Sequence, residues 1–432
     1  MGISNFHKWL VTQNVSQKIF KAFPVAILAI DLSCILHIQA RHSKSISSFI
    51  SNVRKTIKQL TKRVPCKKLA IFMDGPAPLA KLMLQIKRRS WPSKDKGINS
   101  LWLTPGTEVL DQIESNLSQV FPDAFISSHR EAGEGEVKII KYLHQIAGNS
   151  SKHGRYAIYS SDSDVVSILS AARPLTNVYL ILPEKAKLSA VSIDTLWKNI
   201  KCTRDDLSVL ATLTGNDYMP GLPGITMDSL LKNYKNNIVK QGRIRTKALL
   251  LLLESTMDDK KTVRIEEDSI LCDPDLYFQG ILWCLDMYAT GSCSNWQYTY
   301  RNLAPNKEDC LNYLHSIKST LSLRQSKSPN NKPLTCDETL LLLLPHWGRD
   351  MLPERLHAIR DHPELAHWTK PLCQECSVFK EKIAELNRRY TIDKSVRSEI
   401  VEINKEYKEH RQKEHPFIEP PLNIIKKLIN DN

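Results

Sequence analysis

The sequence predicts an α/β fold in which a twisted, mainly parallel sheet flanked by helices is followed by a mainly helical C-terminal region. Over roughly the first two hundred residues, short apolar runs alternate with amphipathic stretches, the pattern of parallel strands joined by helices. After about residue 204, helical periodicity predominates. With 42% hydrophobic and 25% charged residues, the composition excludes a mostly disordered chain and is sufficient for a core.

The predicted elements follow this pattern along the chain. Apolar runs predict strands at 25–30, 68–73, 156–160 and 177–182, with 124–127 as a weaker fifth. Helices are expected at 44–62, 78–90, 106–120, 134–146 and 163–171, and later at 205–213, 226–234, 246–254, 275–289 and 307–321. We expect an exposed loop at 324–333 and a solvated amphipathic helix at 380–411. We expect a core domain over 1–235, a mainly helical domain over 236–412, and a tail over 413–432 that lies on the body.

Charge and cysteine usage restrict the class of protein. The net charge of +14 over 432 residues points to a polyanionic partner. The longest apolar runs are far shorter than the roughly 18 residues of a membrane span, and we expect neither membrane insertion nor secretion. Ten scattered cysteines suit a reducing compartment, and we expect the cytoplasm, with the nucleus as the alternative. The close pair Cys373 and Cys376 lacks a second pair or a suitably spaced histidine and is weak evidence for zinc.

Acidic residues follow three of the predicted strands. Asp31 comes directly after AILAI, Asp74 ends KLAIFMD, and Asp162 and Asp164 follow YAIYSS. The carboxyl ends of parallel strands share one edge of a sheet, where such folds bind ligands. Each aspartate taken singly is as well explained as a helix cap or turn residue. Together they would crowd negative charge at one edge without a counter-ion, which favours a cation site.

Three further carboxylates extend this acidic set. Glu134 and Glu136 lie in the glycine turn GEGE, and Asp217 lies in TGND after an apolar helix. Seven carboxylates without an interleaved histidine or cysteine suit hard cations such as Mg²⁺ or Mn²⁺ and not zinc. Two such ions can activate a water molecule and stabilise a leaving oxygen in phosphodiester hydrolysis. We therefore predict a hydrolytic centre with two metal ions.

A basic helix face begins seven residues after Asp74. In a helix formed by LAKLMLQIKRRSW, each residue is rotated by about 100° from the one before. Four polar or basic side chains then fall within an arc of roughly 100° and form one face. A solvated basic face is the plain alternative, but its position next to a proposed metal ligand favours phosphate binding. Arginine grips phosphate through two parallel hydrogen bonds, and lysine adds a point charge. The residues of this face are Lys81, Gln85, Arg88 and Arg89.

Several sequence blocks occur in a recognisable order. They are MGISNFHKWL, AIDLSCILH, DGPAPLAKLMLQIKRR, LTPGTEVL, GEGEVKII, YSSDSDVV and TGNDYMPGLP, followed by YFQGILWCLDMYATGSCSNWQYTYRNLAP and LLLLLPHWGRDMLP. In this order they resemble the catalytic region of the XRN family of 5′→3′ exoribonucleases, from residue 1 to about residue 355. The resemblance implies a PIN- or flap-nuclease-like fold. It also implies that single-stranded RNA with a 5′-monophosphate is hydrolysed to mononucleotides, with two Mg²⁺ ions or, alternatively, Mn²⁺. We expect a monomer.

The resemblance also implies roles for individual residues. The family stacks the first bases between aromatic rings, which is tolerant of base sequence. His37 matches one of these positions, and Trp296 is our choice for the other, although it is equally explained as a core residue. The implied catalytic and metal-binding acids are Asp31, Asp74, Glu134, Glu136, Asp162, Asp164 and Asp217. The implied substrate-binding residues are Lys81, Gln85, Arg88, Arg89, His37 and Trp296.

Two other functions stay open on the sequence. A flap endonuclease-like DNA 5′ nuclease would share the acidic edge, but it normally carries a glycine-rich helix–turn–helix after the last aspartate. The stretch GLPGITMDSLLKNY is only a partial fit to that motif. A catalytically inactive RNA-binding scaffold is disfavoured because unused, clustered carboxylates repel one another.

Overall fold

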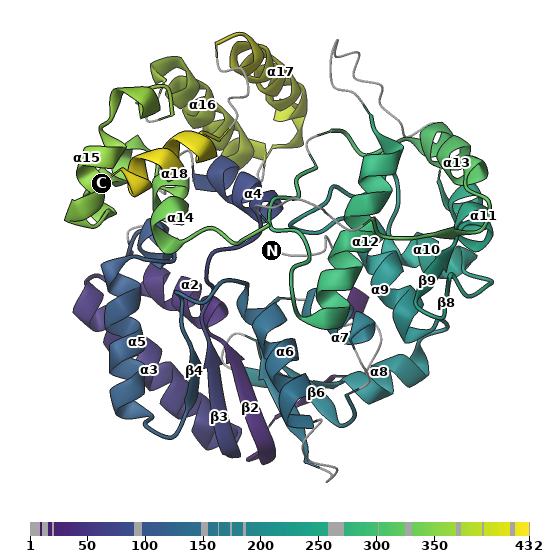
Figure 1. Cartoon of the computed structure of the whole chain (residues 1–432), viewed down its shortest axis with the longest axis horizontal. Coiled ribbons are helices and arrows are strands. Elements are labelled where there is room, and N and C mark those ends of the chain that lie inside the picture. The colour runs from purple at the N-terminus through teal and green to yellow at the C-terminus, as the bar shows by residue number, and fades with distance from the viewer. Residues whose placement is uncertain are drawn as a thin grey trace. The chain divides into compact units, whose positions relative to one another are not determined.

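The computed structural model divides the chain into two compact units, which are described separately below (Figure 1). Unit 1 comprises Met1–Gln85 and Asp95–Cys336, and unit 2 comprises Ile86–Lys94 and Asp337–Asn432. The structure describes residues 9–10, 16–19, 21–89, 97–147, 154–162, 164–172, 175–184, 187–257, 272–300, 302–324, 331–368, 373–390, 393–414 and 420–431. No helix among these residues is both long enough and apolar enough to cross a membrane.

Unit 1 is built on a seven-stranded sheet with the order β1-β7-β6-β5-β2-β3-β4. The five strands β6, β5, β2, β3 and β4 run parallel to one another. At one edge of the sheet, β7 pairs with β6 and β1 pairs with β7, both in antiparallel orientation. The predicted fold class is therefore confirmed. The strands are β1 (Ser16–Lys18), β2 (Val25–Asp31), β3 (Cys66–Phe72), β4 (Phe125–Ser127), β5 (Tyr156–Tyr159), β6 (Val178–Glu184) and β7 (Lys187–Ser192).

The central strand β2 is buried on both faces because helices cover the sheet on two sides. Successive side chains of a strand point to opposite faces. Leu28 and Ile30 accordingly pack in one apolar cluster with residues of α2, α3 and α5, whereas Ile27 and Ala29 pack in another with α6, α7 and α9 (Figure 1). The helices of unit 1 that cover the sheet are α2 (Leu32–His42), α3 (Ile46–Arg63), α5 (Glu108–Val120), α6 (Gly135–Ala147), α7 (Asp164–Ala171), α8 (Ile193–Asn199) and α9 (Arg204–Leu213).

The remainder of unit 1 is mainly helical, as predicted, with a small three-stranded sheet of order β10-β9-β8. The expected helix 307–321 ends early, because Thr320 and Leu321 pair with Arg245 and Ile244 in that sheet. Residues 325–330 of the expected loop 324–333 lie outside the described residues. The elements are α10 (Met227–Asn233), β8 (Val239–Lys240), β9 (Arg243–Arg245), α11 (Thr246–Thr256), α12 (Pro274–Thr290), α13 (Lys307–Ser316) and β10 (Thr320–Leu321). Helix α4 (Leu79–Arg89) begins in unit 1 and ends in unit 2.

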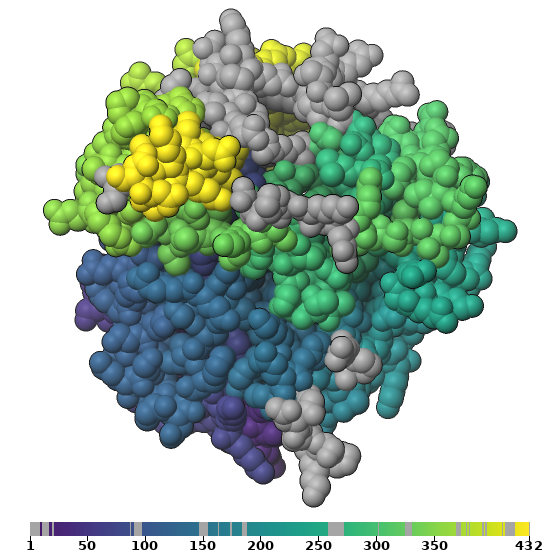
Figure 2. All heavy atoms as spheres, viewed as in Figure 1, coloured from purple at the N-terminus to yellow at the C-terminus, as the bar shows by residue number. Residues whose placement is uncertain are grey.

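The secondary structure in the described part of unit 2 consists of helices. The single amphipathic helix predicted at 380–411 is wrong: two helices form, because Asp393 accepts a hydrogen bond from the Ser395 N–H (2.8 Å) and starts a new turn. The expected tail contains a helix, α18, which buries Ile425 and Leu428 and lies on the surface of unit 2 (Figure 2). The helices are α14 (Cys336–Leu343), α15 (His357–Arg360), α16 (Gln374–Tyr390), α17 (Arg397–Glu414) and α18 (Leu422–Asn430).

A candidate metal centre at the sheet edge

Three carboxylates from separate segments of unit 1 meet at the carboxyl edge of the parallel strands. Asp31 is the last residue of β2, Asp74 follows β3 by two residues, and Glu136 lies in the first turn of α6. Each offers an oxygen atom that lies within 4.8 Å of an oxygen of the other two. The register of β2 with β3 pairs Asp31 with Phe72, which brings both strand ends to one level. The predicted convergence of these acids therefore occurs.

Two serines orient the carboxylates of β2 and β3. Ser33 donates its hydroxyl to Asp74 Oδ2 (2.7 Å) and its main-chain N–H to Asp31 Oδ1 (3.0 Å). Ser160, directly after β5, donates its hydroxyl to Asp31 Oδ2 (2.8 Å). Asp31 is also the N-cap of α2, so that both of its carboxylate oxygens accept hydrogen bonds. Neither serine was predicted as a site residue, although Ser33 stands two residues after a capping aspartate, where its N–H faces the carboxylate.

Gly135 allows the start of α6 to approach the two aspartates. Its main-chain N–H donates to Asp74 Oδ1 (2.7 Å). A Cβ atom at this position would lie 3.2 Å from Asp31 Oδ1 and 3.3 Å from Asp74 Oδ1, closer than ordinary van der Waals contact. The preceding Gly133 has a φ of 109°, a conformation that side-chain-bearing residues rarely adopt. The two glycines of GEGE thus place the glutamates against the strand ends.

Lys81 is the counter-ion of this acidic edge. Its ammonium group, on the first turn of α4, pairs with Glu134 and with Asp217 Oδ2 (3.0 Å), and all three side chains are largely shielded from water. Burial alone would lower the pKa of Lys81, but the neighbouring charges of Glu134, Glu136 and Asp217 outweigh it and raise the pKa well above its usual value. The expectation of an edge without a counter-ion is therefore corrected.

Burial raises the pKa of several of these acids. It raises the pKa of Asp31 to about 7, with a further contribution from the charge of Asp74. It also raises the pKa of Glu134 to about 7, despite the opposing charge of Lys81, and that of Glu136 well above its usual value. Like charges close together and out of water favour the protonated form unless a cation compensates them. Lys81 supplies only one positive charge.

The atom most clearly suited to a cation is Glu134 Oε2. It is buried and, within the described part of the chain, accepts no hydrogen bond. A buried acceptor without a partner is unfavourable, and a metal ion would satisfy it. The donor set here consists of carboxylate oxygens, which fits hard divalent cations. The residues at this edge therefore fit a metal centre.

The remaining predicted acids lie beside this group. Asp162 Oδ1 accepts the main-chain N–H of Asp164 (3.0 Å) at the start of α7, and the Asp162 N–H donates to Ser160 Oγ (3.0 Å). Burial raises the pKa of Asp162, and the charge of Asp217 adds to this effect. Asp164 is buried, and its charge contributes, with those of Glu134 and Glu136, to the raised pKa of Tyr288, of which burial is the larger cause. All seven predicted acids thus belong to one region of unit 1.

The family model of the XRN 5′-3′ exonuclease N-terminus matches residues 1–97 and 90–182. This match extends over residues 1–182 of the 432-residue chain. It is 28% identical over 174 residues to a putative 5′-3′ exonuclease, R528, of Acanthamoeba polyphaga mimivirus, covering 32% of this chain and 28% of that protein. It is 24% identical over 299 residues to 5′-3′ exoribonuclease 1 of Saccharomyces cerevisiae, covering 52% of this chain and 19% of the yeast protein. The chain thus matches less than a third of the length of either XRN-related protein.

The solved structures that resemble the chain share little sequence identity with it and have low TM-scores. The catalytic core of Rad2 in complex with DNA substrate (complex IV) is 17% identical, with a TM-score of 0.43 and coverage of 79% of this chain and 100% of that chain. The T5 D15 protein co-crystallised with metal ions is 11% identical, with a TM-score of 0.32 and coverage of 62% and 87%. The fold class of the chain rests on the sheet topology described above.

The residues predicted to bind RNA are distributed over both units. The Trp296 carbonyl accepts the N–H of Leu79 (2.9 Å), the first residue of α4, and the Trp296 N–H donates to Asn331 Oδ1 (2.7 Å). The Trp296 side chain is half-buried. His37, on α2, and Gln85, on α4, are also half-buried in unit 1. Arg88 and Arg89 belong to unit 2, where Arg88 is exposed and Arg89 half-buried.

Proposed function

We propose that the chain is a Mg²⁺-dependent 5′→3′ exoribonuclease that hydrolyses single-stranded RNA from a 5′-monophosphate end and releases mononucleotides. The observation that carries the proposal is the convergence of the Asp31, Asp74 and Glu136 carboxylates within 4.8 Å of one another at the carboxyl edge of a parallel sheet. The match to the XRN family model and the name of the yeast relative, 5′-3′ exoribonuclease 1, support RNA as the substrate and the 5′ end as the starting point.

The proposed metal ligands are the seven acids of this edge, with Mn²⁺ as an alternative to Mg²⁺. Such cations, when bound, lower the pKa of a water molecule and stabilise charge on a leaving oxygen. The protein's own residues fix the carboxylates beforehand: Ser33 and Ser160 hold the aspartate oxygens, and Gly135 leaves room between them. Because these groups are already positioned, little reorganisation is needed when the cation and substrate bind.

We propose that the basic face of α4 binds the 5′ end of the RNA. Lys81 pairs with Glu134 and Asp217, and cations bound to these acids would free its ammonium group for a phosphate oxygen. Gln85, Arg88 and Arg89 follow Lys81 at helical spacing on the same helix, and we propose that each of them contacts phosphate. His37 and Trp296 are the proposed stacking partners of the first bases, at about 1 to 3 kcal/mol per base. We expect the enzyme to act as a monomer in the cytoplasm.

The test is a rate comparison on one RNA sequence with three different 5′ ends. Degradation of the 5′-monophosphate RNA should exceed that of the 5′-hydroxyl and 5′-triphosphate RNAs, should release mononucleotides, and should stop when EDTA removes the cation. Asp162→Asn should lose activity, whereas Asp123→Asn, at an exposed position just before the amino end of β4, should keep it.

Other outcomes would contradict the proposal in different ways. Equal rates on all three RNAs would remove the phosphate pocket, and activity insensitive to both EDTA and Asp162→Asn would remove the metal centre. Preferential cleavage of a labelled DNA flap would identify a DNA 5′ nuclease. A folded preparation that binds RNA but cleaves no nucleic acid would identify a scaffold.

A further inference from the structure

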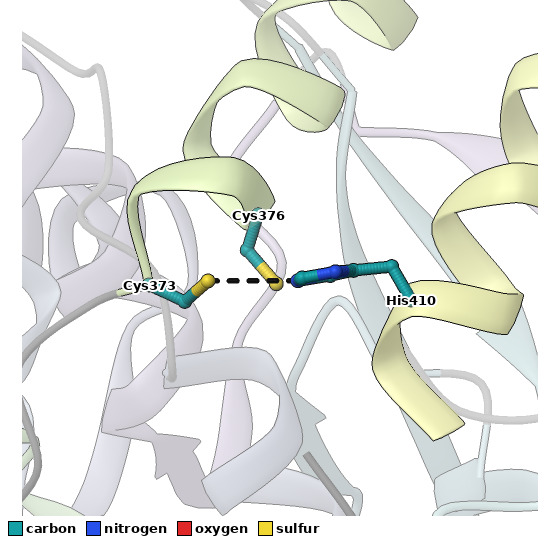
Figure 3. Close-up of side chains that lie close together, drawn as sticks. All are labelled: Cys373, Cys376 and His410. Carbon is teal, nitrogen blue, oxygen red and sulfur yellow. Dashed lines mark hydrogen bonds between the residues drawn. The ribbon is translucent and has the colours of Figure 1, made fainter. Parts of the chain in front are cut away.

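A second group of metal-ligating side chains lies in unit 2. Cys373 precedes α16, Cys376 lies on its first turn, and His410 lies near the end of α17 (Figure 3). Cys373 Sγ is 3.5 Å from His410 Nε2, and the two sulfur atoms and one ring nitrogen all lie within 4.8 Å of one another. Cys376 is buried, with 3% of its surface exposed. The histidine that the sequence spacing did not offer is thus supplied by the return of the chain along α17.

We propose that Cys373, Cys376 and His410 bind a Zn²⁺ ion that fastens α16 to α17. Zinc binds thiolate sulfur at about 2.3 Å and imidazole nitrogen at about 2.0 Å in a tetrahedron, which places sulfur and nitrogen ligands about 3.6 Å apart. The observed 3.5 Å between Cys373 Sγ and His410 Nε2 matches that edge. The three side chains fill three positions of the tetrahedron. This site is separate in chemistry from the carboxylate centre of unit 1, because thiolates select softer ions than carboxylates do.

A carboxylate orients the histidine for this role. Glu375 Oε2 lies 3.0 Å from His410 Nδ1, so that Nδ1 carries the proton and donates it, while Nε2 faces the two sulfurs. Metal-binding histidines commonly have such a carboxylate on the other ring nitrogen, because it fixes the tautomer and increases the basicity of the ligand. The ring of Phe379 packs on His410 with centroids 5.6 Å apart and further limits its rotation.

The helix pair gains stability from such a link because it buries little apolar surface of its own. Among the described side chains of α16 and α17, Cys376 and Ile403 are buried, whereas Val378 and Val401 are 51% and 64% exposed. Phe379 and Tyr407 pack together with ring centroids 5.5 Å apart. A metal ion would join the start of α16 to the end of α17, across 37 residues of chain. Closing a segment of this length restricts the unfolded chain, which is how small structures with little core are commonly stabilised.

Metal content and cobalt absorption of the full-length chain test the proposal. We expect one equivalent of zinc per chain after purification without chelator, not displaced by excess Mg²⁺. Replacement by Co²⁺ should give thiolate-to-metal charge-transfer and tetrahedral visible bands. Cys376→Ser should weaken zinc binding, measured by competition with a chromogenic chelator, by at least about a hundredfold, and Glu375→Gln by about tenfold. The matched controls are Cys66→Ser in β3 and His367→Ala at an exposed position of unit 2, which should leave zinc affinity unchanged.

Limited proteolysis of the same samples reports on the helix pair. Removing zinc should increase cleavage within 391–396, between the two helices, whereas removing Mg²⁺ alone should not. If Cys376→Ser does not fold, the half-buried Cys373→Ser and the exposed Glu375→Gln supply the same test. The proposal is overturned by an unmodified chain that binds no zinc and shows no cobalt–thiolate band, by unchanged affinity in the cysteine variants, or by mass spectra showing a stable Cys373–Cys376 disulfide under reducing-compartment conditions.

Discussion

Replacing Asp31 by asparagine should stabilise the metal-free protein at neutral and alkaline pH. Asparagine has nearly the same shape, and its oxygen can still accept the Ser33 N–H, while its amide group can donate to Ser160 Oγ in place of the present contact. The variant therefore removes a buried charge without opening a cavity. It also removes one of the proposed cation ligands.

The magnitude follows from the pKa of Asp31, which burial raises from 3.8 to about 7. Well below pH 3.8 the carboxyl is protonated in both the folded and the unfolded chain and has no effect on stability. As the pH rises towards 7, the unfolded chain loses its proton first, so the stability of the folded chain falls. Above pH 7 the full cost is present, and the gap between 3.8 and about 7 corresponds to about 4 kcal/mol. Allowing about 1 kcal/mol for the altered hydrogen bond leaves a gain of about 3 kcal/mol for Asp31→Asn.

Urea unfolding in EDTA at pH 5 and pH 8 measures this effect. The variant should be more stable than the parent by about 1 kcal/mol or less at pH 5 and by about 3 kcal/mol at pH 8. Asp123→Asn, which replaces an exposed carboxylate, should show no such pH dependence. Adding Mg²⁺ at pH 8 should stabilise the parent and not the variant, because only the parent retains the complete ligand set.

The opposite pattern would refute the reasoning. If Asp31→Asn is as stable as the parent at both pH values, or less stable at pH 8 than at pH 5 relative to the parent, then the carboxylate of Asp31 is not held in an unfavourable charged state. The electrostatic account of the acidic edge would then be wrong, whatever the enzymatic activity of the variant.

Three further predictions concern single positions. Gly135→Ala should weaken Mg²⁺ binding about tenfold, as measured by titration, because the added methyl group would press on two carboxylate oxygens at 3.2 and 3.3 Å; unchanged affinity would contradict the close approach. Lys138→Met should lower the free energy of unfolding by about 2 to 4 kcal/mol in urea, because the buried ammonium group donates to two main-chain carbonyls at 2.9 Å each. Arg88→Ala should slow degradation of 5′-monophosphate RNA about ten- to a hundredfold and leave 5′-hydroxyl RNA unaffected, whereas Lys55→Ala on the exposed side of α3 should change neither rate.

The parallel part of the sheet and its acidic edge could be predicted because both depend on local pattern. Buried parallel strands appear as continuous apolar runs, and their carboxyl ends must share an edge, so Asp31 and Asp74 could be placed together without coordinates. The antiparallel strands β1 and β7 were not predicted, because β1 has only three residues, SQK, and β7, KLSAVS, mixes polar with apolar residues instead of forming a continuous apolar run.

Contacts between distant segments could not be predicted in the same way. Helical periodicity located Lys81 on the basic face of α4 but did not indicate that its ammonium group would pair with Glu134 and Asp217. Likewise, the spacing of Cys373 and Cys376 was visible, but their approach to His410 depends on where the chain turns between α16 and α17. The domain bounds and residue roles inferred from the sequence stay predictions.

Anomalous diffraction from crystals soaked in Mn²⁺ tests the central claim most directly. We predict strong manganese peaks at coordination distance from the carboxylate oxygens of Asp31, Asp74 and Glu136, and their loss in crystals of Asp31→Asn. Peaks confined to other parts of the protein, or none at saturating Mn²⁺, would contradict the claim that these strand ends form a cation-binding centre.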